Sequence, residues 1–374
     1  MVCEYCKNEN RHAFFTLNNN IICRVCLSYV SLMQNNGTSN EIQYDEIDYK
    51  LSFSLTDKQK EASKNIAILC KESDVLVEAV CGAGKSELVL ESIMHALKQN
   101  KKVVWAIPRR QVVLQLVDRL TDVFKNMDVI AVCEGHTKRV HAPLVICTTH
   151  QLYRYHKQID LLILDEPDAF PYKNNKLLET FVLNAVVGHI IYLTATPSKQ
   201  HRTWLKQGKL KHVTLYERPF KNPLVVPKVI CHYKLVLIIQ LMKLLKTKRH
   251  QTMIFVPSIK LATIFSTLFK IEMITSKTKD KDEIIHRFTN EEFQFLCCTT
   301  ILERGVTFKN VHVIVFLANH IVFDAASLIQ ISGRVGRHKD FPTGECIFLC
   351  DEKSKEVETC ISLILKANHS VYGV

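Results

Sequence analysis

The sequence contains no hydrophobic run long enough to cross a membrane. Its longest apolar stretch, from Leu235 to Met242, is far shorter than the roughly 20 residues that a spanning helix requires. Residues Met1 to Cys6 also lack the pattern of a secretory signal, because Cys and Glu stand where an apolar core would be needed. We therefore expect a cytoplasmic protein.

Acidic side chains are fewer than basic ones. The chain has 37 Asp and Glu against 49 Lys and Arg, which gives a net charge of +12. This excess favours a polyanionic partner, although a merely basic cytosolic protein would have the same composition. The length of 374 residues allows two or three domains, and 47% hydrophobic residues are enough for large cores.

Fourteen cysteines in a cytosolic protein indicate metal binding rather than a disulfide framework. The pairs Cys3-x-x-Cys6 and Cys23-x-x-Cys26 are separated by sixteen residues, so two knuckles can present four thiolates to one tetrahedral Zn²⁺. The segment between them suits a hairpin, and zinc would fold a piece too small to have a core of its own. The other ten are scattered or lie in apolar runs and are interpreted as core filler or inert surface: Cys70, Cys81, Cys133, Cys147, Cys231, Cys297, Cys298, Cys346, Cys350 and Cys360.

The stretch from Val75 to Leu90 predicts a strand, a phosphate-binding loop and a helix. Small residues, Gly82-Ala83-Gly84, let backbone N–H groups converge on a phosphate, and the following helix adds the partial positive charge of its N-terminus. Lys85 would then bind the β- and γ-phosphates, and the Ser86 hydroxyl would be a Mg²⁺ ligand. The loop pattern G-x-x-x-x-G-K-[ST] departs at one position, because Ala79 replaces its first glycine.

Strands and helices alternate through the rest of the chain. Continuous apolar strands joined by helices predict parallel sheets that are buried on both faces. Polar residues follow the ends of these strands, where open α/β sheets bind ligands. No phosphate loop occurs in the second half. The predicted strands are 75–77, 103–107, 144–147, 159–164, 190–193, 253–256, 272–275, 295–299, 311–317 and 346–349. Five predicted helices span 112–120, 235–245, 260–269, 280–288 and 325–331. Two more are predicted only by their starting points, near Thr56 and near Glu352.

Two further groups of residues could complete an ATPase site. Asp165 and Glu166 follow the strand 159–164, so Asp165 can hold Mg²⁺ and Glu166 can act as general base; the alternative is a solvated acidic turn. Arg334 and Arg337, three residues apart, would face one way if their helix continued through them, and could stabilise charge on the γ-phosphate. The alternative is a surface basic patch. Because these arginines lie in the second half, hydrolysis would require closure of the two domains.

An ordered set of motifs resembles a superfamily-two helicase core. In that superfamily the first loop position is often Ala, as it is at Ala79. The four-cysteine piece, the VCGAGKSE loop (80–87), DEPDAFPY (165–172) and QISGRVGR (330–337) together resemble the ComFA family of Gram-positive competence ATPases. The superfamily motifs are Gln59, AVCGAGKS (79–86), PRR (108–110), TTHQL (148–152), DEPD (165–168), TATP (194–197), TTILERGVT (299–307) and QISGRVGR (330–337).

This resemblance implies an α/β fold of two tandem RecA-like helicase domains preceded by a small zinc-binding module. It implies ATP, Mg²⁺ and Zn²⁺ as cofactors, with Gln59 reading adenine and Thr194 and Thr196 linking the nucleotide to the nucleic acid. The nucleotide-binding set is Gln59, Gly82, Ala83, Gly84, Lys85, Ser86, Glu87 and Gly305 beside Arg304, and the catalytic set is Lys85, Asp165, Glu166, Gln330, Arg334 and Arg337. The expected domains are a zinc module at 1–34, a linker at 35–54, a first helicase domain at 55–218, a connection at 219–230 and a second helicase domain at 231–374.

By the same analogy, single-stranded DNA is the expected polyanion, bound through its sugar-phosphate backbone. A lysine run at 277–281 could help, although such a run is usually a solvated loop. The family further implies another late-competence protein as a partner through the zinc module, peripheral association with the inner face of the membrane, and a homo-oligomer. The residues expected to contact DNA are Arg109, Arg110, Thr148, Thr149, Ser258 and Thr299.

Three hypotheses for the function follow. The first is an ATP-driven single-stranded DNA translocase that acts in DNA uptake. The second is a scaffold that binds DNA and partner proteins and uses ATP only as a switch. The third, a general DNA or RNA helicase, is disfavoured as an RNA enzyme because the DEPD, ERGVT and QISGRVGR strings differ from the RNA-acting DEAD-box set.

Overall fold

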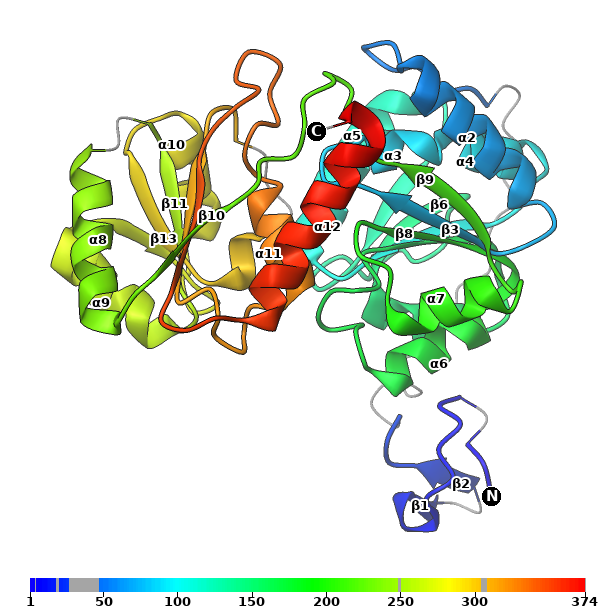
Figure 1. The fold of residues 1–374 in the computed structure, drawn as a ribbon. Coiled ribbons are helices and arrows are strands. Elements are labelled where there is room, and N and C mark those ends of the chain that lie inside the picture. Colours follow the sequence, from blue (N-terminus) through cyan, green and yellow to red (C-terminus); the bar gives the residue numbers. More distant parts are fainter. Residues whose placement is uncertain (4, 18–19, 27–46, 248–249, 304–307, 374) are drawn as a thin grey trace. The chain divides into compact units, whose positions relative to one another are not determined.

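The computed structural model describes residues 1–3, 5–17, 20–26, 47–247, 250–303 and 308–373. By its internal contacts the chain divides into two units, Met1–Ala79 with Lys85–Leu215, and Val80–Gly84 with Tyr216–Val374. Each unit contains one large parallel sheet, and the first also contains a small hairpin near the N-terminus (Figure 1). Among the described residues, no helix is both long and apolar enough to cross a membrane.

The first unit is built on a seven-stranded sheet whose neighbouring strands are all parallel, in the order β5-β6-β4-β7-β8-β3-β9. All five residues of the β4 sequence VVWAI are buried, because layers of helix cover both faces of the sheet. The strands are β3 (Val75–Ala79), β4 (Val103–Ile107), β5 (Val129–Val132), β6 (Leu144–Thr148), β7 (Ile159–Asp165), β8 (Val186–Thr194) and β9 (Lys211–Leu215).

The helices of the first unit lie on both sides of this sheet. From β3 to β4 and on to β5 the chain crosses the sheet in one direction, and from β7 to β8 and on to β9 it crosses in the other. Right-handed crossovers therefore place α4 and α5 on one face and α6 and α7 on the other, as Figure 1 shows. The helices are α2 (Asp57–Leu69), α3 (Lys85–Leu88), α4 (Leu90–Lys98), α5 (Arg110–Val123), the 3₁₀ segment η3 (Thr149–Tyr155), α6 (Lys176–Ala185) and α7 (Lys199–Lys206).

The second unit repeats this design with a six-stranded parallel sheet, in the order β10-β15-β14-β11-β13-β12. Leu237 and Leu241 of α8 pack with Phe265 of α9 against one face, so the two helices share a core. The strands are β10 (Lys228–Cys231), β11 (Thr252–Phe255), β12 (Glu272–Ile274), β13 (Phe295–Cys298), β14 (His312–Phe316) and β15 (Cys346–Cys350). The helices are α8 (Lys234–Thr247), α9 (Ile259–Phe269), α10 (Lys281–Thr289), the 3₁₀ turn η4 (Thr300–Leu302), α11 (Ala325–Ser332) and α12 (Lys355–Tyr372).

The N-terminal piece is an antiparallel hairpin, β1 (Phe14–Leu17) and β2 (Asn20–Cys23), preceded by the 3₁₀ turn η1 (Arg11–Ala13). The predicted hairpin between the two cysteine pairs is therefore present. All ten predicted strands are also present, within a few residues at their ends. Three strands were not predicted: β5, β9 and β10.

Gly188 occupies a close approach between β7 and β8, where the pairing register shifts between Ile159 and Leu161. A Cβ atom at this glycine would lie 2.0 Å from the backbone oxygen of Asp160. We predict that Gly188→Ala forces the strands apart and lowers the free energy of unfolding by about 1–3 kcal/mol. Urea unfolding measures this change.

The matched control is Val187→Ala, one residue earlier in the same strand. The Val187 side chain is 58% exposed, so the expected change is within about 0.5 kcal/mol. Equal midpoints for Gly188→Ala and the wild type would contradict the close approach.

Candidate functional site

The predicted phosphate loop connects β3 to α3. Gly82 and Gly84 have φ values of +82° and +81°, a left-handed backbone conformation that favours glycine, and the chain turns sharply there. Lys85 begins α3, and its Nζ donates to the carbonyl of Ala79 at 3.3 Å. A loop of small residues that leads into a helix and carries a lysine fits a nucleotide's phosphates. Ser86 and Glu87 follow on α3.

Two predicted nucleotide-binding residues have further partners within the protein. Glu87 is buried and its Oε1 accepts a hydrogen bond from Nη2 of Arg119 at 2.9 Å. Gln59, 2% exposed, forms a capping box with Thr56: its Oε1 accepts from the Thr56 N–H at 2.9 Å. The sequence predicted that a helix begins near Thr56, but the bond from the Thr56 N–H to the Gln59 side chain was not predicted.

The acidic residues lie at the end of β7, next to β8 in the sheet. Asp165 is the last residue of β7 and pairs with Leu193, and the N–H of Glu166 donates to the Leu193 carbonyl at 2.9 Å. Glu166 has φ +54°, so the backbone turns directly after the strand. Since β8 also pairs with β3, the acids and the phosphate loop emerge at the same edge of one sheet. Carboxylate and hydroxyl oxygens at this edge fit a Mg²⁺ ion.

Asp168 connects this acidic turn to the threonines after β8. Its Oδ1 accepts from Thr194 Oγ1 and its Oδ2 accepts from Thr196 Oγ1, both at 2.7 Å, and the Thr196 N–H donates to Thr194 Oγ1 at 2.9 Å. Asp168 is 6% and Thr194 1% exposed, so water competes little for these bonds. No role was predicted for Asp168 from the sequence. Its place as the fourth residue of the DEPD string was the available signal.

The residues predicted to contact DNA also follow strand ends. Arg109 and Arg110 follow β4, and Thr148 ends β6, the strand next to β4. The Arg110 Nε donates to the Glu134 carbonyl at 2.9 Å, and Thr149 is fully buried. In the second unit, Ser258 caps α9 after β11 and Thr299 follows β13, and these two strands are paired.

The predicted catalytic residues of the second unit surround the end of α11. Gln330 is buried, and its Oε1 accepts a hydrogen bond from Sγ of Cys81, a residue of the same unit, at 3.0 Å. The helix ends at Ser332 with Gly333 as its C-cap, so it does not continue through the two arginines. The condition for Arg334 and Arg337 to share a helix face is therefore not met.

The two arginines differ in exposure after this helix end. Arg334 is 2% exposed, whereas the half-buried Arg337 turns back and donates its Nε to the Gly333 carbonyl at 2.6 Å. Two other predicted residues, Arg304 and Gly305, lie outside the described residues.

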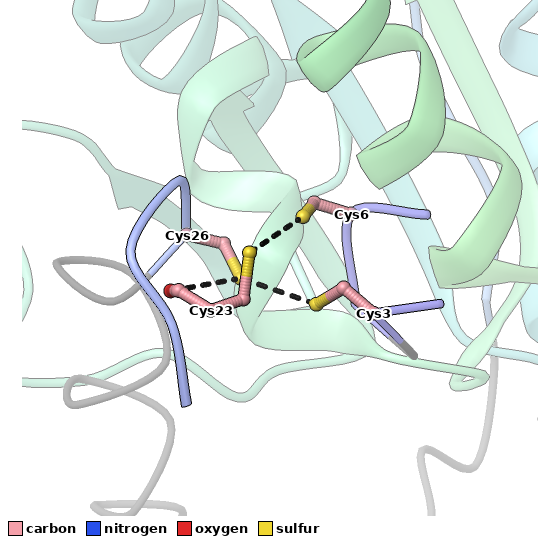
Figure 2. A group of neighbouring side chains, drawn as sticks. All are labelled: Cys3, Cys6, Cys23 and Cys26. Atoms are coloured by element: carbon pink, nitrogen blue, oxygen red, sulfur yellow. Dashed lines mark hydrogen bonds between the residues drawn. The ribbon is translucent and has the colours of Figure 1, made fainter. Parts of the chain in front are cut away.

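Four cysteines converge in the N-terminal piece (Figure 2). The Sγ atoms of Cys3 and Cys26 are 3.5 Å apart and those of Cys6 and Cys23 are 3.6 Å apart, and all four lie within 4.8 Å of one another. Tetrahedral Zn²⁺ with Zn–S bonds of about 2.3 Å requires sulfur separations of about 3.8 Å. Burial raises the pKa of Cys6 to about 11, so a bound metal would have to displace a proton from its thiol. The cluster is compatible with zinc.

Two family models match the chain, one in each half. Residues 52–199 match the type III restriction enzyme res subunit, and residues 233–339 match the helicase conserved C-terminal domain. With two parallel RecA-like sheets, the chain is an ATPase of the superfamily-two helicase type, a class that uses ATP and Mg²⁺. It is 38% identical over 335 residues to the competence protein ComFA of Streptococcus pneumoniae. The matched region covers 84% of this chain and 77% of that protein. The chain belongs to the ComFA family of helicase-like competence proteins.

A second relative is the competence protein ComFA of Bacillus subtilis, at 32% identity over 369 residues, covering 91% of this chain and 78% of that protein. Among solved structures, S. cerevisiae Dbp5 bound to RNA and ADP BeF3 has a TM-score of 0.64 at 16% identity, covering 84% of this chain and 92% of that one. RecG bound to a three-way DNA junction has a TM-score of 0.59 at 19% identity, and the match covers 85% of this chain and 47% of that one. The predicted fold class, two tandem RecA-like domains, is confirmed.

We predict that Asp168→Ala destabilises the first unit, because it leaves the hydroxyls of Thr194 and Thr196 without their carboxylate acceptor. Leaving buried polar groups unsatisfied costs about 1–3 kcal/mol. Thermal unfolding should show a lower Tm, and the control Asp122→Ala, on the exposed side of α5, should leave it nearly unchanged. An unchanged Tm for Asp168→Ala would mean that these bonds add little.

Proposed function

We propose that this protein is an ATP-driven translocase on single-stranded DNA that acts in DNA uptake. The observation that carries the proposal is the order of residues along the carboxyl edge of the first sheet. The phosphate loop, the threonines and the acids follow the neighbouring strands β3, β8 and β7, and the candidate DNA contacts follow the next strands, β4 and β6. One sheet edge therefore offers ATP chemistry at one end and a nucleic-acid path at the other.

The nucleotide would be held at the β3 end of this edge. Lys85 binds its β- and γ-phosphates, Ser86 and Asp165 hold the Mg²⁺ ion, and Gln59 contacts the adenine. Glu166 accepts the proton of the attacking water as general base. The bound metal supplies charge neutralisation on the phosphates. The proposed pocket further includes Gly82, Ala83, Gly84, Glu87 and Gly305.

The second unit would supply the remaining positive charge. Gln330, Arg334 and Arg337 act on the γ-phosphate, which carries growing negative charge as it is transferred. These residues lie on another domain of the chain, proposed at 231–374, so hydrolysis requires closure of that domain on the one at 55–218. Repeated closure and opening would convert ATP turnover into movement along DNA.

Nucleic acid would be bound through its phosphates, because the candidate contacts are arginines and hydroxyls at strand ends. Arg109, Arg110, Thr148, Thr149, Ser258 and Thr299 form this proposed set. Asp168 would relay the state of the acidic turn to Thr194 and Thr196 through its two hydrogen bonds. Affinity should fall steeply with salt, because phosphate contacts release counterions.

The competence relatives support the setting of this activity. We propose a cytoplasmic protein at the inner face of the membrane uptake machinery, with another late-competence protein bound through the zinc module, residues 1–34. A homo-oligomer is compatible with this arrangement.

We predict that Lys85→Ala and Glu166→Gln abolish DNA-stimulated ATP hydrolysis while the fold survives. The first removes the phosphate ligand and the second the general base, and loss of such a base lowers kcat by about 10²–10⁴-fold. The measurement is phosphate release with single-stranded DNA, duplex DNA and RNA at matched salt. Lys98→Ala, at an exposed position of α4, is the control.

Undiminished ATP turnover in both variants would contradict the proposed ATPase site. A second assay, displacement of streptavidin from biotinylated single-stranded DNA, separates a motor from a scaffold, because only a translocase clears the block directionally. ATP hydrolysis without displacement would favour the nucleotide-gated scaffold. Equal stimulation by RNA would favour a general helicase.

We propose that the four cysteines hold one structural Zn²⁺ ion. Elemental analysis of the purified chain should find about one zinc per chain, since four thiolates complete a tetrahedral shell. Cys26→Ser should lose most of this metal, whereas Cys231→Ser, an exposed cysteine of β10, should retain it. Zinc-free wild-type protein would contradict the assignment.

A further inference from the structure

Arg218 carries a permanent charge yet is only 3% exposed. Its guanidinium donates four hydrogen bonds, all to backbone carbonyls of the second unit. Nε donates to Cys81 at 2.9 Å, Nη1 to Gly336 at 2.9 Å and to Val335 at 3.3 Å, and Nη2 to Gly333 at 3.3 Å. One side chain therefore binds the carbonyl of Cys81 together with carbonyls of the turn Gly333–Gly336, which is distant from Cys81 in the sequence.

Burial of this guanidinium is costly. Desolvation and, after it, the nearby charge of Arg337 lower the pKa of Arg218 to about 10, so the group is still charged at neutral pH. Among the described residues its hydrogen-bond acceptors are carbonyl oxygens, and a buried charge that is held by neutral groups is costly. This cost indicates a role beyond simple packing.

The carbonyls of Gly333, Val335 and Gly336 belong to the turn that carries the two proposed catalytic arginines. Carbonyls at the end of α11 have no partner within the helix, and Arg218 supplies one. Arg218 Nη2 and Arg337 Nε donate to the same Gly333 oxygen, at 3.3 Å and 2.6 Å. The direction of the Arg337 side chain thus depends on an atom that Arg218 also holds.

We propose that Arg218 is a positioning residue for ATP hydrolysis, which fixes the turn Gly333–Gly336 and thereby aims Arg337. The inference rests on the proposed function, in which Arg337 acts on the γ-phosphate. A guanidinium suits this task because its planar set of five N–H donors can bind several carbonyls at once. A lysine donates from a single nitrogen and cannot reach the same set.

The test is a double-mutant cycle on the full chain with single-stranded DNA. Arg218→Gln should lower kcat by about 10- to 100-fold, as expected when a reacting group is displaced by about 1 Å. Turnover is expressed per site titrated with a fluorescent nucleotide, so that loss of folded protein does not count as loss of kcat. Arg287→Gln, on α10 of the same unit, is the matched control and should keep the wild-type kcat.

The decisive comparison is between Arg337→Gln and the double variant Arg218→Gln/Arg337→Gln. If Arg218 acts through Arg337, the two should have the same kcat within about twofold, because residues that act as one unit are not additive. Arg218→Lys keeps the charge, and we expect it to lower kcat as well. It is the second variant to test if Arg218→Gln does not fold.

Two results would contradict the role of Arg218 without affecting the proposed function. The first is a wild-type kcat in Arg218→Gln or Arg218→Lys, and the second is a double variant in which the two reductions of kcat multiply. A wild-type chain without DNA-stimulated hydrolysis would instead contradict the proposed function itself, so the two failures are distinguishable.

Discussion

Parallel hydrogen bonding within each of the two large sheets determines where the functional loops of each unit lie. In a parallel sheet every strand ends at the same edge, so segments far apart in the chain are brought together there. The strands β3, β7 and β8 therefore end at one edge, and the phosphate loop, the acidic turn and the threonines follow them there. Both faces of such a sheet are covered by helices, so its strands must be apolar and polar chemistry is confined to the loops.

Buried polar contacts then fix the loops that the sheet brings together. The Asp168 carboxylate joins the turn after β7 to Thr194 and Thr196, and Gln59 closes the first turn of α2. Arg218 donates hydrogen bonds to the carbonyls that follow the end of α11. Each such group is costly to bury unless its partners are in place, so these contacts tie the loop geometry to the fold as a whole.

Much of this arrangement could be predicted from the chain itself. Long apolar runs such as 103–107 and 159–164 identified the central strands, because those strands are buried on both faces. β9 and β10 lie at sheet edges and expose part of their residues, and β5 is a four-residue edge strand, so none has a continuous buried run. The helix predicted at 325–331 ends at Ser332, one residue beyond its predicted end, and Gly333 caps it.

Features that depend on neighbours along the chain can be identified from the amino-acid order: the phosphate loop between a strand and a helix, the acid pair after β7, and the spacing of four cysteines. The pairing of groups that are distant in the chain is visible only in the folded protein. The contacts of Asp168 with Thr194, of Glu87 with Arg119 and of Arg218 with Gly336 span 26, 32 and 118 residues. Such pairs form because strand order and helix packing bring the groups together, and no local pattern encodes that order.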